Sequence, residues 1–392
     1  MHLLSLPVTT YWSTVAGQVG KMNKPMKKII TLMIVFTMLL HTEESQSQTL
    51  LPSSTEEISP IPDPLGFAGM YAGMVGDELI AAGGANFLDK MPWEGGNKAW
   101  HDDIFVYSLP HKSWEKLSLK LPKALAYGVA ISYQDGLVVF GGSEQDNVPS
   151  KAVYYLHKKD KTWHIEHWED MPIALVNMCA ERIGEQVVFA AGSDKLNSMP
   201  TDQVLLFDLK NQVWSALPTL PAAKRINAVS AKINGQFYLF TGIELVPEAD
   251  GKIKRNILQD AYRLTLSKTN DGITSGTWER LADLPQGMAA GPLSAAVIKK
   301  RNQIVLFGGL DHQTAQHADP VTHPGFLPDV LAYDIKTNSW SVLGNLDKKQ
   351  IRLTLPAVQH ADQYYLISGE VGPGVRTNSI LSIQLNKLKS IK

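Results

Sequence analysis

The sequence predicts an all-β fold, a closed ring of six blades with four strands each, and three observations lead to it. The first is a repeat: an apolar strand ends in a Gly-Gly-like doublet, a second apolar strand follows, and then a tryptophan. The doublets are Gly83-Gly84, Gly141-Gly142, Ala191-Gly192, Thr241-Gly242 and Gly308-Gly309, and the tryptophans are Trp114, Trp163, Trp214, Trp278 and Trp340. A sixth doublet, Ser368-Gly369, has its second strand but no tryptophan.

The second observation is the period of this repeat. Repeats of about 50 residues that contain only strands are typical of a kelch β-propeller. The apolar runs are short, rich in β-branched and aromatic residues, and bounded by Gly, Asn and Asp turns, which predicts strands. They are residues 79–82 and 104–107, 137–140 and 152–156, 187–190 and 204–207, 237–240 and 261–264, 304–307 and 330–333, and 364–367 and 380–383.

The third observation is that no segment keeps a 3.6-residue apolar period, so little helix is expected. The glycine doublets are therefore not predicted to bind phosphate, because a phosphate-binding glycine motif needs a following helix. A doublet in every blade instead indicates a structural role. Glycine permits close approach where a strand ends near a crowded axis, and we interpret the strand before each doublet as the inner one. The recurring tryptophans are interpreted in the same way, as packing anchors.

The sixth blade reaches the C-terminus without a fourth strand. The stretch Leu50–Ile61 is predicted to supply it, since it ends in Ile61-Pro62 as other blades end in Leu-Pro or Met-Pro. Closing the ring in this way pairs strands that would otherwise be exposed edges. The propeller is therefore expected to span residues 48–392.

The first 47 residues predict an upstream extension and a secretion signal peptide. Lys21, Lys24, Lys27 and Lys28 precede the apolar run 29–40, and small serines follow it near a cleavage point at Ser47. The run is shorter than the ~20 residues that span a bilayer. Loss of this segment changes the formal net charge from −1 to −3. We expect an exported, periplasmic protein.

Composition excludes several classes of function. No Lys/Arg run follows the N-terminal segment, so nucleic acid is not an expected partner. The single cysteine, Cys179, permits no internal disulfide and lies in an apolar stretch, where it is expected to pack as a small hydrophobe. No cysteine follows the apolar N-terminal run, so no lipid anchor to a membrane is expected.

The sharpest break in the repeat follows the sixth doublet, over residues 369–377. Glu370 comes directly after a strand, then a Gly-Pro-Gly turn, then Arg376. This spacing brings an acid/base group close to a guanidinium that can bind an anion. The structural alternative is a surface turn with a solvated ion pair.

Three other breaks are candidates. Arg225 and Asn227 begin the fourth blade, after Lys224. The first-blade insertion 86–103 is either a lid over the channel or a solvated loop. The fifth-blade insertion 311–326 has metal-like composition, but its spacing matches no ligand pattern, so no metal is predicted. Its acidic and histidine residues are Asp311, His312, His317, Asp319 and His323.

From about residue 58 onward the chain resembles the kelch-type sialic acid mutarotases (N-acetylneuraminate epimerases), and in particular their cyclically permuted branch. Residues 369–377 are similar to that family's Gly-Glu-x-x-Pro-Gly-x-Arg-Thr motif. Residues 66–69, 81–87 and 126–129 are similar to segments near the C-terminal end of unpermuted members, and 288–291 to a mid-chain segment. The family's Pro-Arg is Lys224-Arg225 here, and the insert after Phe87 differs in length and sequence.

The resemblance implies an isomerase that opens and recloses the ring of free sialic acid, converting the α anomer released by sialidases into the β anomer. It implies no cofactor, with Glu370 as the base and Arg376 holding the substrate carboxylate. Arg225, Asn227, Asn86 and Tyr127 are further implied substrate contacts.

Two other classes stay open. A non-catalytic kelch module that binds glycan or protein also fits an isolated Glu-Arg pair. A copper oxidase on a propeller needs a Tyr–Cys crosslink and two histidine ligands, and Cys179 is its only possible cysteine.

Overall fold

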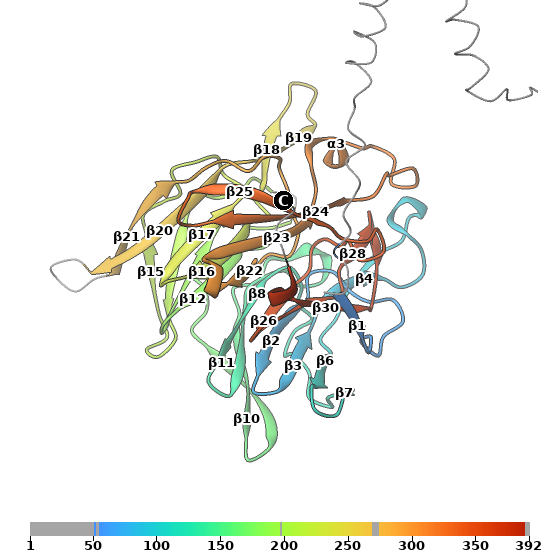
Figure 1. Ribbon diagram of the computed structural model, residues 1–392. Helices are drawn as coiled ribbons and strands as arrows, with labels where there is room; N and C mark the ends of the chain where they lie inside the picture. The colour runs from blue at the N-terminus through green and yellow to red at the C-terminus, as the bar shows by residue number, and fades with distance from the viewer. Residues whose placement is uncertain (1–50, 52–54, 197, 269–273, 389–392) are drawn as a thin grey trace, which may run out of the picture. The chain divides into compact units, whose positions relative to one another are not determined.

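Six antiparallel sheets of four strands follow one another along the chain and form the blades of a propeller (Figure 1). The computed structural model describes residues 51, 55–196, 198–268 and 274–388. The expected signal peptide and the extension before it lie outside these residues. Within the described part of the chain, no helix has the length and apolar character needed to cross a membrane.

The first half of the ring consists of three blades, formed by residues 71–217. Blade 1 consists of β2 (Tyr71–Val75), β3 (Glu78–Ala82), β6 (Ile104–Ser108) and β7 (Ser113–Lys116). Blade 2 consists of β8 (Val129–Tyr133), β9 (Gly136–Phe140), β10 (Val153–Lys159) and β11 (Thr162–Trp168). Blade 3 consists of β12 (Cys179–Ile183), β13 (Gln186–Ala190), β14 (Val204–Asp208) and β15 (Val213–Leu217).

The second half of the ring repeats this plan. Blade 4 consists of β16 (Val229–Ile233), β17 (Gln236–Phe240), β20 (Ala261–Lys268) and β21 (Thr274–Arg280). Blade 5 consists of β22 (Ala296–Ile298), β23 (Gln303–Gly309), β24 (Leu327–Asp334) and β25 (Ser339–Asn345). Blade 6 consists of β26 (Ala357–His360), β27 (Gln363–Ile367), β30 (Ile380–Gln384) and β1 (Thr55–Ile58). The predicted six-bladed all-β propeller is confirmed.

Three additional hairpins are each inserted between the second and third strands of a blade. They are β4 (Ala85–Phe87) with β5 (Lys98–Trp100), β18 (Ile243–Pro247) with β19 (Ile253–Ile257), and β28 (Glu370–Gly372) with β29 (Val375–Arg376). The described helices are single turns, as the missing 3.6-residue period predicts: η1 (Pro92–Glu94), η2 (Gln145–Asn147), η3 (Lys299–Arg301), α3 (His312–Ala315) and η4 (Leu385–Lys387).

One detail of the prediction is wrong. The strand that ends in the glycine doublet is the second strand of its blade, and the first strand is innermost. First strands of neighbouring blades contact one another around the axis, as β2 does with β8 and β26, and β12 with β8 and β16. Glu370 therefore follows a second strand, one step out from the channel wall.

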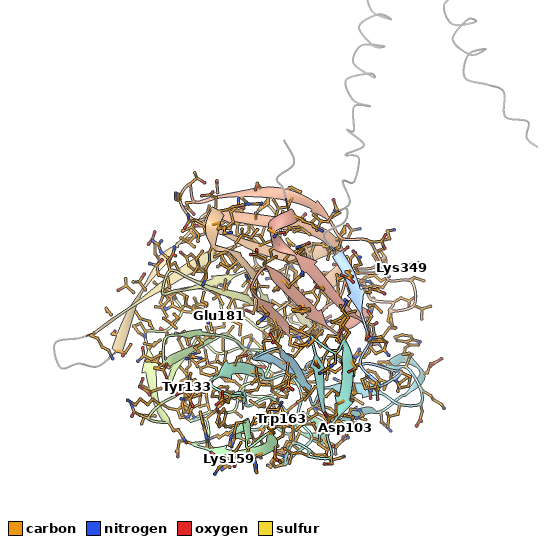
Figure 2. All side chains as sticks on the ribbon, turned by 60° about the horizontal axis from the view of Figure 1, so that its bottom comes forward. Asp103, Tyr133, Lys159, Trp163, Glu181 and Lys349 are labelled. Atoms are coloured by element: carbon orange, nitrogen blue, oxygen red, sulfur yellow. The ribbon has the colours of Figure 1, made fainter. Side chains whose placement is uncertain are left out.

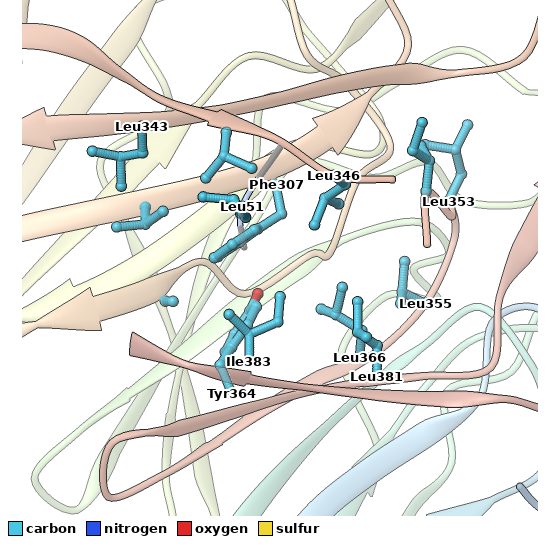
Figure 3. Close-up of a cluster of buried hydrophobic side chains, with 14 of the residues drawn as sticks. Leu51, Phe307, Leu343, Leu346, Leu353, Leu355, Tyr364, Leu366, Leu381 and Ile383 are labelled. Atoms are coloured by element: carbon cyan, nitrogen blue, oxygen red, sulfur yellow. The ribbon is translucent and has the colours of Figure 1, made fainter. Parts of the chain in front are cut away.

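The N-terminal strand completes the last blade, as predicted. β1 pairs antiparallel with β30, and Thr55 lies opposite Ile383 while Ile58 lies opposite Ile380. Leu51 packs separately, in the cluster between blades 5 and 6 with Phe307 and Leu343 (Figure 3). Residues from the two ends of the described chain therefore close the ring together.

Removing this closure is expected to destabilise the fold. A protein that begins at residue 63 loses the burial of Leu51 and Ile61 and leaves β30 as an exposed edge. Each buried aliphatic side chain contributes about 1.5–3 kcal/mol, so we expect a loss of roughly 5 kcal/mol in the free energy of unfolding. Urea unfolding of this protein and of one that begins at residue 48 measures the difference in their free energies of unfolding. Equal midpoints for the two proteins would contradict this role.

The repeated tryptophans of the fourth strands join one blade to the segment before it. The indole N–H of Trp214 donates to the Glu169 carbonyl at 3.2 Å, and that of Trp340 donates to the Ala282 carbonyl at 3.0 Å. Trp214 also packs at 4.5 Å between ring centroids on Phe207 of its own blade. These contacts agree with the interpretation of the tryptophans as packing anchors.

A closed ring of six backbone hydrogen bonds surrounds the axis just before the innermost strands. Each blade contributes one residue, whose N–H donates to the carbonyl of the equivalent residue in the preceding blade at 2.8–3.0 Å. The ring residues are Gly69, Tyr127, Asn177, Asn227, Ala290 and Thr354. All six have positive φ, from 51° to 66°. At Gly69 a Cβ would lie 2.6 Å from Cδ1 of Tyr127, so glycine is required there.

A buried carboxylate lies among the inner strands. Glu181 of β12, labelled in Figure 2, is 6 % exposed. Its Oε1 accepts hydrogen bonds from Ser230 of blade 4 at 3.1 Å and Ser294 of blade 5 at 2.7 Å. Burial raises the pKa of this carboxyl, and the two serine hydroxyls and Lys232 lower it by less. Glu181 thus connects three blades while carrying a desolvation penalty when ionised.

This arrangement predicts a pH-dependent effect of Glu181→Gln. A raised pKa in the folded state means that the parent's stabilisation is complete below the unfolded pKa and declines as pH rises through the folded pKa. The amide retains an oxygen acceptor for both serines and never ionises. The Tm of the variant minus that of the parent should therefore increase between about pH 4, near the unfolded pKa of glutamate, and about pH 8. Exposed Glu169→Gln is the control, and a difference independent of pH would contradict this account.

Candidate active site

The six blades place one residue each at an equivalent position beside the hydrogen-bonded ring. In every blade the residue before the ring residue forms an antiparallel bridge with the residue after the doublet. The latter residues are Ala85, Ser143, Ser193, Ile243, Leu310 and Glu370. Glu370 is the charged member of this set. Its N–H and carbonyl both bond to Leu353 at 2.8 Å, which fixes its backbone beside the ring residue Thr354.

Glu370 and Arg376 face each other across the hairpin β28–β29. They are directly opposed in the strand register, and Nη2 of Arg376 lies 3.3 Å from Oε1 of Glu370. The turn between them returns the Gly374 N–H toward the other carboxylate oxygen, Oε2, at 3.4 Å. The structure therefore brings together the acid/base group and the guanidinium that the sequence motif predicts.

The guanidinium of Arg376 is buried, and some of its N–H donors make no hydrogen bond to the described residues. Its side chain is 4 % exposed, and its Nε and Nη1 have no hydrogen-bond partner among the described residues. Buried donors without partners are uncommon because each costs about 1–3 kcal/mol. Glu370 is 20 % exposed, so the pair is accessible on the carboxylate side. A guanidinium with two free donors beside a carboxylate matches the needs of an anionic ligand.

The first-blade insertion forms a wall next to this pair. Cζ of Arg376 lies 5.2 Å from the centre of the Phe87 ring on β4, and Figure 1 shows β28 beside β4. Gly374 lies against Pro92 and Trp93, since a Cβ at this glycine would be 2.9 Å from Cγ of Pro92 and 3.2 Å from the indole. Of the two alternatives for this insertion, a lid or a solvated loop, its packing against the β28–β29 hairpin argues against a freely solvated loop.

Arg225 is not placed with Glu370. Its side chain is 0 % exposed, and its N–H groups bond to both carboxylate oxygens of Asp260 and to the carbonyls of Ala223 and Thr241. These partners make it a buried structural ion pair of blade 4 rather than a free anion contact. Arg352 occupies the equivalent position in blade 6, where its guanidinium donates to Ser379, and burial lowers its pKa to about 10.

The three other predicted contacts lie near the ring in different settings. Asn86 is 1 % exposed, and its amide bonds to the Gly66 carbonyl and to His101. Tyr127 and Asn227 are both ring residues. Tyr127 lines a small cavity of about 50 Å³ at the ring, whereas Oδ1 of Asn227 is buried and has no hydrogen-bond partner among the residues that the structure describes. Asn227 thus keeps an unused acceptor, while the amide of Asn86 is occupied within the fold.

The fifth-blade insertion and Cys179 supply no further centre. Asp311 caps the helical turn α3 by accepting from the Thr314 N–H, and His317 and His323 are in edge-to-face contact. No group of three His, Cys, Asp or Glu side chains in the described ranges is arranged to hold a metal ion. The Cys179 thiol is buried, donates to the Ala190 carbonyl, and has its pKa raised by burial to about 12.

Comparison with known proteins identifies two kinds of relative. The profile of the Attractin/LZTR1 beta-propeller family matches residues 79–376. Over 111 residues the chain is 40 % identical to the N-acetylneuraminate epimerase of Brucella suis, a match covering 26 % of this chain and 28 % of that protein. It is 35 % identical over 114 residues to N-acetylneuraminate epimerase 1 of Escherichia coli O6:H1, covering 27 % and 30 %. For the Vibrio vulnificus N-acetylneuraminate epimerase the identity is 34 % over 96 residues, covering 23 % and 25 %. The matched segments thus span less than a third of each of these three relatives.

Proposed function

The chain belongs to the Attractin/LZTR1 beta-propeller family, and from this premise we propose that it is a mutarotase, an isomerase that interconverts the α and β anomers of free sialic acid (N-acetylneuraminate). The names of the relatives support this choice of substrate, as does the sequence motif at residues 369–377. The observation that carries the proposal is the buried Arg376 with two unpartnered donors beside the carboxylate of Glu370.

The proposed reaction is acid/base ring opening and reclosure. Arg376 binds the substrate carboxylate through its free donors, which orients the anomeric carbon next to Glu370. The Glu370 carboxylate takes the proton of the anomeric hydroxyl while the bond from the anomeric carbon to the ring oxygen breaks, and water donates a proton to that ring oxygen. The open ketone rotates and recloses from its other face. On reclosure the attacking hydroxyl releases its proton to water, and Glu370 returns its proton to the new anomeric oxygen. No atoms or electrons are gained, and the chemistry needs no cofactor.

Asn227 is the second substrate contact that we propose. Its buried Oδ1, which has no partner in the described part of the chain, can accept a hydrogen bond from a sugar hydroxyl. Tyr127, two positions away in the ring and separated from Asn227 by Asn177, contributes an aromatic face. Arg225 and Asn86 support the site indirectly, because their polar groups are bonded within the fold.

Proton NMR of freshly dissolved sialic acid tests the proposed activity. Catalytic amounts of the protein should speed the approach of the α and β signals to equilibrium beyond the spontaneous rate. If binding is detected without acceleration, the chain is instead a glycan-binding module, which is the alternative function. That alternative draws on the same Glu-Arg pair.

We also propose that the protein acts in the periplasm, in the scavenging of sialic acid released by sialidases. The N-terminal apolar run and its preceding lysines support export. Sequencing the N-terminus of the native protein tests this. A mature chain that starts near residue 48 is expected, and a chain that retains residues 26–40 in the cytoplasm would contradict it.

A further inference from the structure

The hairpin β4–β5 carries a cation that the proposed reaction has not used. Lys98 is directly opposite Phe87 in the strand register, and Trp100 is opposite Ala85. Directly opposed residues in an antiparallel pair project from the same face. Phe87, Lys98 and Trp100 therefore share one face of this hairpin, and Asn86 lies on the other.

That face is the one next to the Glu370–Arg376 pair. Phe87 contacts the Arg376 guanidinium from this face. The Lys98 ammonium lies 5.0 Å from the ring centre of Tyr127 and 5.4 Å from that of Trp100. A continuous strip of contacts thus runs from blade 6 across blade 1 to blade 2, in the order Glu370, Arg376, Phe87, Lys98, Tyr127.

The charge of Lys98 is not neutralised within the fold. In the described part of the chain its ammonium has aromatic contacts and no carboxylate partner. The buried guanidinium groups of Arg225 and Arg352 are by contrast fixed by hydrogen bonds within the fold. Lys98 is also held in place through its backbone, because its carbonyl accepts from Gln145 of blade 2 and a nearby residue of the same strand, Trp100, bonds to Ser143.

We propose that Lys98 is a second substrate-binding cation, which recognises the polar end of the sugar acid remote from its carboxylate. The inference rests on the proposed function. With the carboxylate on Arg376, a substrate lying along the strip has its far hydroxyl and amide oxygens at Lys98, where an ammonium donates to them. Phe87 between the two cations presents an apolar face to the sugar ring. Lys98 thereby sets specificity for a sugar acid long enough to reach both cations.

The test compares Lys98→Met, Lys98→Arg and the control Lys90→Met, which removes an exposed lysine from the same insertion. Methionine keeps an apolar stem against Tyr127 and Trp100 while removing the charge. Loss of one charge-assisted hydrogen bond corresponds to a rise of about 10- to 100-fold in the Kd and KM for N-acetylneuraminate. Because this contact exists before the ring opens, kcat should change by less than about twofold.

Each outcome of the experiment is decisive. Lys98→Arg should restore most of the affinity, and Lys90→Met should match the parent in Kd, KM and Tm. Two results with an active parent would overturn the Lys98 assignment while the mutarotase proposal stands. In the first, Lys98→Met has the parent's Kd and KM. In the second, it lowers kcat at an unchanged KM. If the parent neither binds sialic acid nor speeds its mutarotation, both proposals fail.

Discussion

Glu370→Gln is expected to lower kcat for anomer interconversion by about 10²–10⁴-fold, the usual contribution of a positioned general base. Glutamine has the shape of glutamate and still accepts from Arg376, so the hairpin β28–β29 should keep its geometry. It cannot take the proton of the anomeric hydroxyl. Substrate affinity should change little, because the carboxylate contact belongs to Arg376. NMR rates corrected for spontaneous mutarotation, together with a Kd from calorimetry, measure both effects.

The control for this variant is Glu56→Gln on β1, an exposed glutamate in the same blade. It should retain the parent's kcat and Tm. A Glu370→Gln protein that equilibrates the anomers at the parent's rate would remove Glu370 as the base, whatever its affinity for the sugar.

Arg376→Met is expected to raise the Kd and KM for sialic acid by about 10²-fold, since it removes two charge-assisted hydrogen bonds to the carboxylate. Methionine still packs against Phe87 and eliminates the buried donors that have no partner in the free protein. The Tm should therefore fall by no more than about 3 °C. Arg376→Lys should recover only part of the affinity, because an ammonium lacks the planar fork that matches a carboxylate.

Calorimetry and thermal melts of these two variants separate binding from folding. Arg255→Lys, at an exposed position on β19, is the matched control and should leave the Kd for sialic acid and the Tm unchanged. Loss of affinity accompanied by an equal collapse of Tm would mean that Arg376 is a structural residue. A Kd equal to the parent's would mean that the free donors do not meet the substrate.

The sequence predicts the blade architecture because every blade packs in the same way and therefore repeats the same sequence pattern. A strand, a doublet, a strand and a tryptophan recur where the structure has a four-stranded sheet whose indole donates a hydrogen bond to the segment before that blade. The innermost strand was predicted incorrectly, because the glycine doublets were interpreted as marking the crowded axis, whereas they follow second strands. Second strands such as β9 are fully buried between neighbouring sheets, whereas the first strand β8 is only partly buried.

The candidate site is predictable only in part, because the sequence reveals pairs that are close along the chain but not pairs that only the fold brings together. Glu370 and Arg376 break the repeat within one hairpin, so their spacing alone brings them together. Arg225 also breaks the repeat, yet its partner Asp260 is 35 residues away and no local pattern reveals that the two pair inside blade 4. The contact of Phe87 with Arg376 joins the two ends of the ring and depends on its closure. Among the ring residues, only Gly69 and the asparagines Asn177 and Asn227 are of types that favour positive φ, so they are the local sequence signal of the hydrogen-bonded ring.

That ring changes what kind of repeat protein this is. In an open array of repeats each unit touches only its neighbours, so the terminal units fray and stability is a sum along a line. Here the N–H of Gly69 donates to Thr354, which makes the first blade the neighbour of the last. No blade is terminal, and displacing any one of them breaks two of the six axial hydrogen bonds at once. Partial unfolding from an end has no starting point, so the residues at the mouth share a single cooperative unit with the whole propeller.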